Sequence, residues 1–131
     1  MTTRFRVQKL IRDRLPEMMR AQGLAVFDRS LDDQEFVAAL KDKLIEEARE
    51  VQDAASPGEL AEELADVMEV ILALAKVSGL DMGQIESLRA AKRAERGGFD
   101  LRVFNAAVEA DDGQPAAAYY LARPNQYPRE V

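Results

Sequence analysis

Apolar side chains recur at intervals of three and four residues through the middle of the chain, which is the spacing of amphipathic helices. Each periodic segment opens on a start signal, such as Asp32 with Glu35 or Ser56 followed by a proline, and ends near a glycine or a loop. The predicted helices cover about residues 13–23, 32–54, 56–78 and 81–97.

Two short stretches outside these helices, 24–31 and 99–104, carry the residue types or the alternation of β-strands. The second could pair with residues 4–7 or with the first. The last part of the chain, rich in alanine and then in tyrosine and proline, is expected to be an extended tail. The prediction is therefore an all-α fold: an antiparallel bundle of about four helices with short peripheral strands, in a domain over 1–105 followed by a tail over 106–131.

Acidic residues fall where the helical projection places apolar faces. Glu47 lies within the apolar stripe of the second predicted helix, with Glu50 at its edge and Glu46 further out. Glu63 and Asp66 project from one flank of the apolar face of the third helix. Because the connection between the two helices is short, they are expected to be antiparallel neighbours whose carboxylates converge at the seam.

Four carboxylates held together repel one another, and a divalent cation removes that repulsion. A ligand set made only of oxygens selects a hard ion, which favours Mg²⁺, with Mn²⁺ as its substitute. One E-x-x-E motif is usually a solvated helix face. Two such motifs on consecutive helices, each touching an apolar face, favour a metal site.

The fourth predicted helix carries the opposite charge. Met82 and Ile85 begin a stripe that Arg89, Lys92 and Arg96 continue at helical spacing. These side chains are either a clamp for phosphate groups or long aliphatic stems that cover the core. An acidic metal site combined with a basic stripe is the arrangement that holds a metal–polyphosphate.

Composition narrows the possible chemistry. The 131 residues include 18 Lys and Arg against 24 Asp and Glu, and neither cysteine nor histidine. The absence of cysteine excludes a disulfide framework and a thiolate nucleophile, and the absence of histidine excludes an imidazole base. The motif of a glycine-rich phosphate loop is also absent. The net charge of −6 argues against general nucleic-acid binding, and no apolar run is long enough for a membrane span. We therefore expect a cytoplasmic protein.

The acidic pattern, Glu46-Glu47-x-x-Glu50, twelve residues, then Glu63-x-x-Asp66, resembles the signature of the MazG-like all-α nucleoside-triphosphate pyrophosphohydrolases. The segments Lys9 to Pro16 and Lys92-x-x-x-Arg96-Gly97-Gly98-Phe99 are similar to those of a single-domain branch, which also resembles phosphoribosyl-ATP pyrophosphohydrolase. The resemblance covers roughly residues 8–104.

This resemblance implies Mg²⁺-dependent cleavage of a nucleoside triphosphate to a nucleoside monophosphate and pyrophosphate. It assigns the metal ligands to Glu47, Glu50, Glu63 and Asp66. It implies that Glu46 orients or deprotonates the attacking water, a role that Glu47 could share. It gives phosphate binding to Lys92 and Arg96, and further to Lys9 and Arg12.

Several alternatives stay open at this point. The substrate is either an ordinary or modified nucleotide to be removed, or phosphoribosyl-ATP in histidine biosynthesis, whose extra group Lys9, Arg12 and Arg14 could bind. A non-catalytic, metal-binding helical oligomer is the third possibility. The resemblance implies a homodimer or homotetramer. The wide apolar faces also need more partners than one chain supplies, so we expect a homo-oligomer, at least a dimer, whose second subunit contributes part of the pocket for the base.

Overall fold

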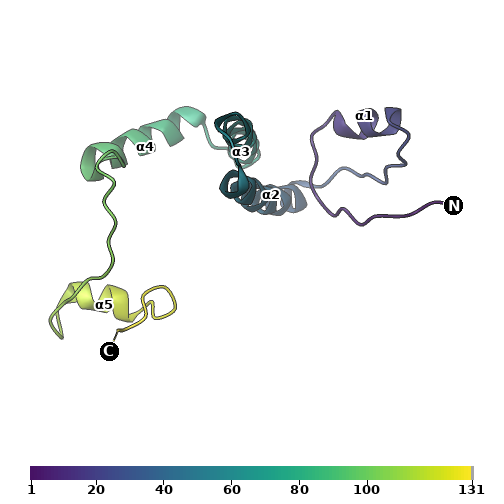
Figure 1. Cartoon of the computed structure of the whole chain (residues 1–131). Helices are drawn as coiled ribbons and strands as arrows, with labels where there is room; N and C mark the ends of the chain where they lie inside the picture. The colour runs from purple at the N-terminus through teal and green to yellow at the C-terminus, as the bar shows by residue number, and fades with distance from the viewer. Residues whose placement is uncertain (131) are drawn as a thin grey trace. The chain divides into compact units, whose positions relative to one another are not determined.

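The computed structural model describes residues 1–130 and divides the chain into two compact units, Met1–Lys92 and a second that begins at Arg93. Each unit is described by itself. The helices of the described residues are labelled in Figure 1: α1 (Leu15–Ala21), α2 (Asp33–Asp53), α3 (Pro57–Val77), α4 (Met82–Arg96) and α5 (Pro115–Leu121). The predicted all-helical class and the four predicted helices are confirmed, each to within about two residues.

The two long helices begin where local hydrogen bonds satisfy their first amide groups. At α2 the Asp32 carboxylate accepts from the Glu35 N–H at 2.8 Å, and the Glu35 carboxylate accepts from the Asp32 N–H at 3.3 Å. At α3 the Ser56 hydroxyl accepts from the Glu59 N–H at 3.2 Å, and Pro57 occupies the first helical position.

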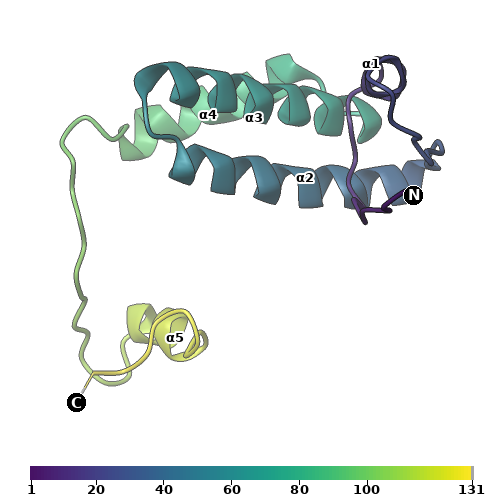
Figure 2. The ribbon, with the colours of Figure 1, turned by 45° about the vertical axis from the view of Figure 1, so that its right-hand side comes forward.

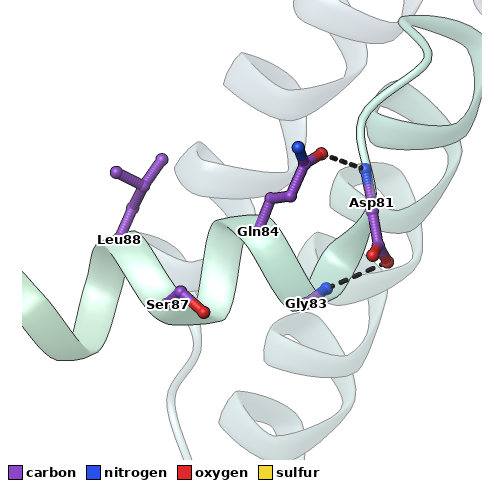
Figure 3. Close-up of a pocket in the computed structure, with 5 residues that line it drawn as sticks. All are labelled: Asp81, Gly83, Gln84, Ser87 and Leu88. Atoms are coloured by element: carbon purple, nitrogen blue, oxygen red, sulfur yellow. Dashed lines mark hydrogen bonds between the residues drawn. The ribbon is translucent and has the colours of Figure 1, made fainter.

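The start of α4 uses similar side-chain bonds, shown in Figure 3. The Gln84 side-chain oxygen accepts from the Asp81 N–H at 3.1 Å, and the Asp81 carboxylate accepts from the Gly83 N–H at the same distance. Before this turn the chain leaves α3 through Gly79, whose φ of +70° suits a residue without a side chain. The predicted boundary between the third and fourth helices is thus set by local chemistry.

The main packing interface joins α2 to α3, two antiparallel helices of 21 residues each (Figure 2). Leu40 of α2 and Val70 and Ala75 of α3 are its buried apolar residues, and Glu47 is buried with them. At 1.5 Å per residue each helix is about 30 Å long, so this pair provides a rigid frame for the side chains along its seam. Within residues 1–130 no helix is long and apolar enough to span a membrane.

The predicted peripheral strands are wrong: residues 1–130 contain no strand. In 24–31, the Arg20 guanidinium donates to the Val26 carbonyl at 2.9 Å and binds the Asp28 carboxylate at 2.5 Å. Residues 4–7 meet this segment through Arg4, whose guanidinium carbon lies 4.4 Å from the centre of the Phe27 ring. Side-chain contacts take the place of the backbone ladder that a strand requires.

The segment 99–104 fails to form a strand for a different reason. The Arg102 N–H donates to the Phe99 carbonyl at 3.1 Å, which closes a turn, and Arg102 has a φ of +57°. The left-handed conformation interrupts the extended backbone that alternation predicted. Phe99 and Leu101 are consequently almost fully exposed.

The predicted extended tail contains a helix, α5, so this part of the expectation is also wrong. Pro115 occupies its first turn and a run of three alanines follows, which favours helix locally. The rings of Tyr119, Tyr120 and Tyr127 lie edge to face or tilted, with centres 4.9–6.0 Å apart. Arg123 lies over the Tyr119 ring at 3.9 Å and donates to the Tyr119 carbonyl. The division at residues 105 and 106 remains a prediction.

Candidate metal centre

The predicted carboxylates converge at the seam of α2 and α3. Glu47 and Glu50 are three residues apart on α2, and Glu63 and Asp66 are three apart on α3, so each pair projects from one side of its helix. One carboxylate oxygen from each of the four lies within 4.8 Å of the others. The structure therefore brings all four side chains together, while their role as metal ligands remains a prediction.

Two of these carboxylates bury oxygens that have no hydrogen-bond partner within residues 1–130. Glu47 is only 6% exposed, and its Oε2 atom is unpartnered, as is Oε2 of Glu63. A buried polar atom without a partner is costly, and a buried carboxylate is more so. Four oxygen donors, with no nitrogen or sulfur among them, fit a hard dication such as Mg²⁺.

The crowding changes the acidity of the cluster. Burial, and then the neighbouring Glu50 carboxyl, raise the pKa of Glu47 from its ordinary 4.5 to about 7. The pKa of Glu63 is also raised, first by its contact with the Glu50 carboxyl and then by burial. In the cation-free cluster Glu47 therefore keeps a proton to higher pH than an ordinary glutamate does, and a bound dication would displace that proton.

Glu46 lies beside the cluster in a different environment. Burial alone would raise the pKa of Glu46, but Lys9 at 3.1 Å and Lys43 at 3.2 Å outweigh it and the pKa is lowered. Lys43 also approaches Glu47 at 3.6 Å. The predicted water-activating residue is thus an ionised carboxylate next to the four candidate ligands.

Lys43 is a site residue that the sequence analysis missed. It lies three and four residues before Glu46 and Glu47, the spacing at which helical side chains meet. Its side chain is only 19% exposed. That spacing was the signal that could have identified it.

The N-terminal cations predicted to bind phosphate contact the acidic site itself. The Arg12 guanidinium donates to Asp66 Oδ1 at 2.6 Å, and Lys9 pairs with Glu46 as described above. Both residues therefore lie at the site, although in this structure their partners are carboxylates.

The basic stripe of α4 is not joined to the carboxylates by any ion pair within residues 1–130. Arg89 pairs with Glu86 of its own helix, through two hydrogen bonds of 2.8 and 2.5 Å. Lys92 and Arg96 form no ion pair with any described residue. The phosphate-binding role of these three residues remains a prediction.

The helical pair and its acidic seam describe a class of protein: an all-α protein with four converging carboxylates that could bind a metal ion. Residues 6–92 match the family described as phosphoribosyl-ATP pyrophosphohydrolase, so the chain belongs to that family, within the MazG-like superfamily. The predicted resemblance is confirmed. The family consists of pyrophosphohydrolases of nucleotide-like substrates and is typically dependent on a divalent metal.

A curated relative from Mycolicibacterium smegmatis, described as an uncharacterized protein, is 48% identical over 46 residues. The match covers 35% of this chain and 47% of the relative, so the chain spans about half of the relative's length. No solved structure matches the chain.

Proposed function

We propose that this protein hydrolyses nucleoside triphosphates, ordinary or modified, to a nucleoside monophosphate and pyrophosphate with Mg²⁺, or Mn²⁺ in its place. The observation that carries the proposal is the convergence of four carboxylates within 4.8 Å, two of them with buried unpartnered oxygens, in a member of a pyrophosphohydrolase family. Such a cluster is unfavourable without a cation and is well suited to one.

The acidic side chains have two roles in the proposed reaction: they bind the metal and they orient the attacking water. Glu47, Glu50, Glu63 and Asp66 would hold the metal, which when bound neutralises charge on the phosphate oxygens. Water attacks phosphorus, the bond between the α and β phosphates breaks, and a proton of the water passes to a carboxylate. Glu46, which is paired with Lys9 and Lys43, would orient that water, and Glu47 could share the task.

A substrate panel tests the proposal. Purified protein is incubated with ordinary and modified nucleoside triphosphates and with phosphoribosyl-ATP, with and without Mg²⁺, and pyrophosphate is measured. Pyrophosphate from nucleoside triphosphates only when Mg²⁺ is present supports the proposal.

Variants of the metal ligands sharpen this test. Glu50→Gln and Asp66→Asn should abolish turnover, while Glu69→Gln, an exposed change on α3 outside the cluster, should leave it unchanged. Wild-type turnover in either ligand variant, with native circular dichroism, would refute the ligand assignment.

A second candidate is the hydrolysis of phosphoribosyl-ATP, a step of histidine biosynthesis. The description of the matching family names this activity. That substrate carries an additional phosphoribosyl group, which the basic residues Lys9, Arg12 and Arg14 before α1 could bind. Lys9 and Arg12 contact carboxylates of the site. Pyrophosphate released from phosphoribosyl-ATP alone would favour this candidate. Release from no substrate would favour a non-catalytic, metal-binding oligomer.

The proposed active form is a homodimer or homotetramer. Large apolar side chains of α2 and α3 are left exposed within the described chain; they are Ile45, Leu60, Leu64, Met68, Ile71 and Leu72. Several exposed apolar side chains on a helical pair with so small a core favour association with a second copy. Light scattering after size exclusion would give the mass of the assembly directly, and a monomeric mass would refute this part of the proposal.

A further inference from the structure

The extended segment that precedes α1 makes one ion pair with each of the two long helices. Lys9 pairs with Glu46 of α2 at 3.1 Å, and Arg12 pairs with Asp66 of α3 at 2.6 Å. Figure 2 shows this part of the chain crossing the α2–α3 pair before it enters α1. We call residues 9–12 the strap.

The two ends of the strap differ in what they contact. Glu46 is outside the set of four converging carboxylates, whereas Asp66 is a member of that set. Lys9 therefore attaches the strap beside the cluster, and Arg12 places a positive charge on the cluster itself.

Arg12 is the only cation paired with the α3 half of the cluster in the described part of the chain. Among residues 1–130, Asp66 pairs with Arg12 alone, and neither Glu63 nor Glu50 forms an ion pair. A guanidinium keeps its charge at any physiological pH, so this pair cannot be removed by deprotonation. A competing cation at Asp66 or a competing anion at Arg12 can separate the two partners.

We propose that Arg12 is a built-in counter-ion of the carboxylate cluster that a dication displaces and that the substrate's polyphosphate then accepts. The free protein neutralises Asp66 with Arg12. When a dication takes that position, Arg12 is left close to the site, held by Lys9, and its planar donor group suits phosphate oxygens. The inference rests on the proposed function, because it needs both a metal and a phosphate-bearing substrate.

This exchange has a consequence for metal affinity that does not depend on catalysis. Arg12 competes with the metal for Asp66 in the free protein, so removal of its charge should tighten metal binding. Because both partners are partly exposed to solvent, the competition is modest, and we expect the dissociation constant for Mn²⁺ to fall by about twofold to fivefold in Arg12→Gln. Arg12→Lys keeps the charge and should remain close to wild type.

The experiment titrates Mn²⁺ into the full-length chain and follows free Mn²⁺ by electron paramagnetic resonance, without any nucleotide. Wild type is compared with Arg12→Gln, Arg12→Lys and the control Arg6→Gln, an exposed residue of the same region with no ion pair to described residues. Tighter binding in Arg12→Gln alone supports the exchange, and unchanged or weaker binding there overturns it. If wild type binds no Mn²⁺, the proposed metal site fails and the inference fails with it, so the two failures are distinguishable.

Steady-state kinetics supply the second measurement. Once Arg12 has moved to the polyphosphate it contributes to substrate binding, so Arg12→Gln should raise KM severalfold and lower kcat little, with partial rescue by Arg12→Lys. An unchanged KM in Arg12→Gln would overturn the second half of the exchange even where Mn²⁺ binding is tighter.

Discussion

Replacing Glu47 by Gln tests whether the Glu47 carboxylate, when ionised, destabilises the metal-free protein. The change keeps the size of the side chain and removes a carboxyl that is 6% exposed and has an unpartnered oxygen. Burial and Glu50 raise its pKa from 4.5 to about 7, and the difference corresponds to at most about 3 kcal/mol at pH 8. Solvent at the rim of the cluster reduces this, so Glu47→Gln should stabilise the metal-free protein by about 1–3 kcal/mol.

The same pKa fixes the direction of the pH dependence. The folded protein keeps the Glu47 proton up to about pH 7, whereas the unfolded chain loses it near pH 4.5. The contribution of Glu47 to stability is therefore full below pH 4.5 and is lost as the pH rises to about 7. In Glu47→Gln this loss should be absent.

Urea unfolding followed by circular dichroism measures both effects, at pH 5 and pH 8, with and without Mg²⁺. Mg²⁺ should stabilise the wild type, by about 2.7 kcal/mol at a hundredfold excess over its dissociation constant, and should stabilise Glu47→Gln much less. The matched control is Glu69→Gln on the exposed face of α3. A Glu47→Gln protein that is less stable than wild type at pH 8 without metal would contradict the reasoning.

Three further changes follow from other contacts. Lys43→Met removes the cation that touches Glu46 and Glu47, and should destabilise the metal-free protein by about 1 kcal/mol in urea unfolding at pH 8. Ser56→Ala removes the α3 cap and should cost about 1 kcal/mol in the same assay at any pH. Met68→Glu places a charge on the exposed apolar surface of α3 and should lower the mass found by light scattering, and an unchanged mass would exclude this surface as an interface.

The helices could be predicted from the sequence because their signals are local. Asp32 with Glu35 and Ser56 with Pro57 act within one turn, and the structure uses these contacts at the helix starts. The convergence of the four carboxylates needed only helical spacing and the short connection between two helices. Each of these inferences depends on residues near one another in the chain.

The strands could not be predicted correctly because a strand depends on a distant partner. Alternation at Phe99, Leu101 and Val103 gives no information about a neighbouring strand, and the turn at Arg102 prevents one. The contacts of Arg12 were hidden for the same reason, since 54 residues separate it from Asp66. The family resemblance pointed to Arg12 as a phosphate-binding residue but not to the carboxylate that it contacts.

The α2–α3 pair has two separate sources of instability: repulsion among its carboxylates and the exposure of its apolar side chains. Its buried core is small, with Leu40, Val70 and Ala75 alongside the acidic Glu47. A cation offsets the repulsion among the carboxylates but covers none of the exposed apolar side chains, whereas a second copy could cover that surface without neutralising the cluster. Mg²⁺ should therefore raise the stability of both the wild type and Met68→Glu. If Met68→Glu dissociates into monomers and Mg²⁺ no longer stabilises it, the second subunit instead helps to build the metal site.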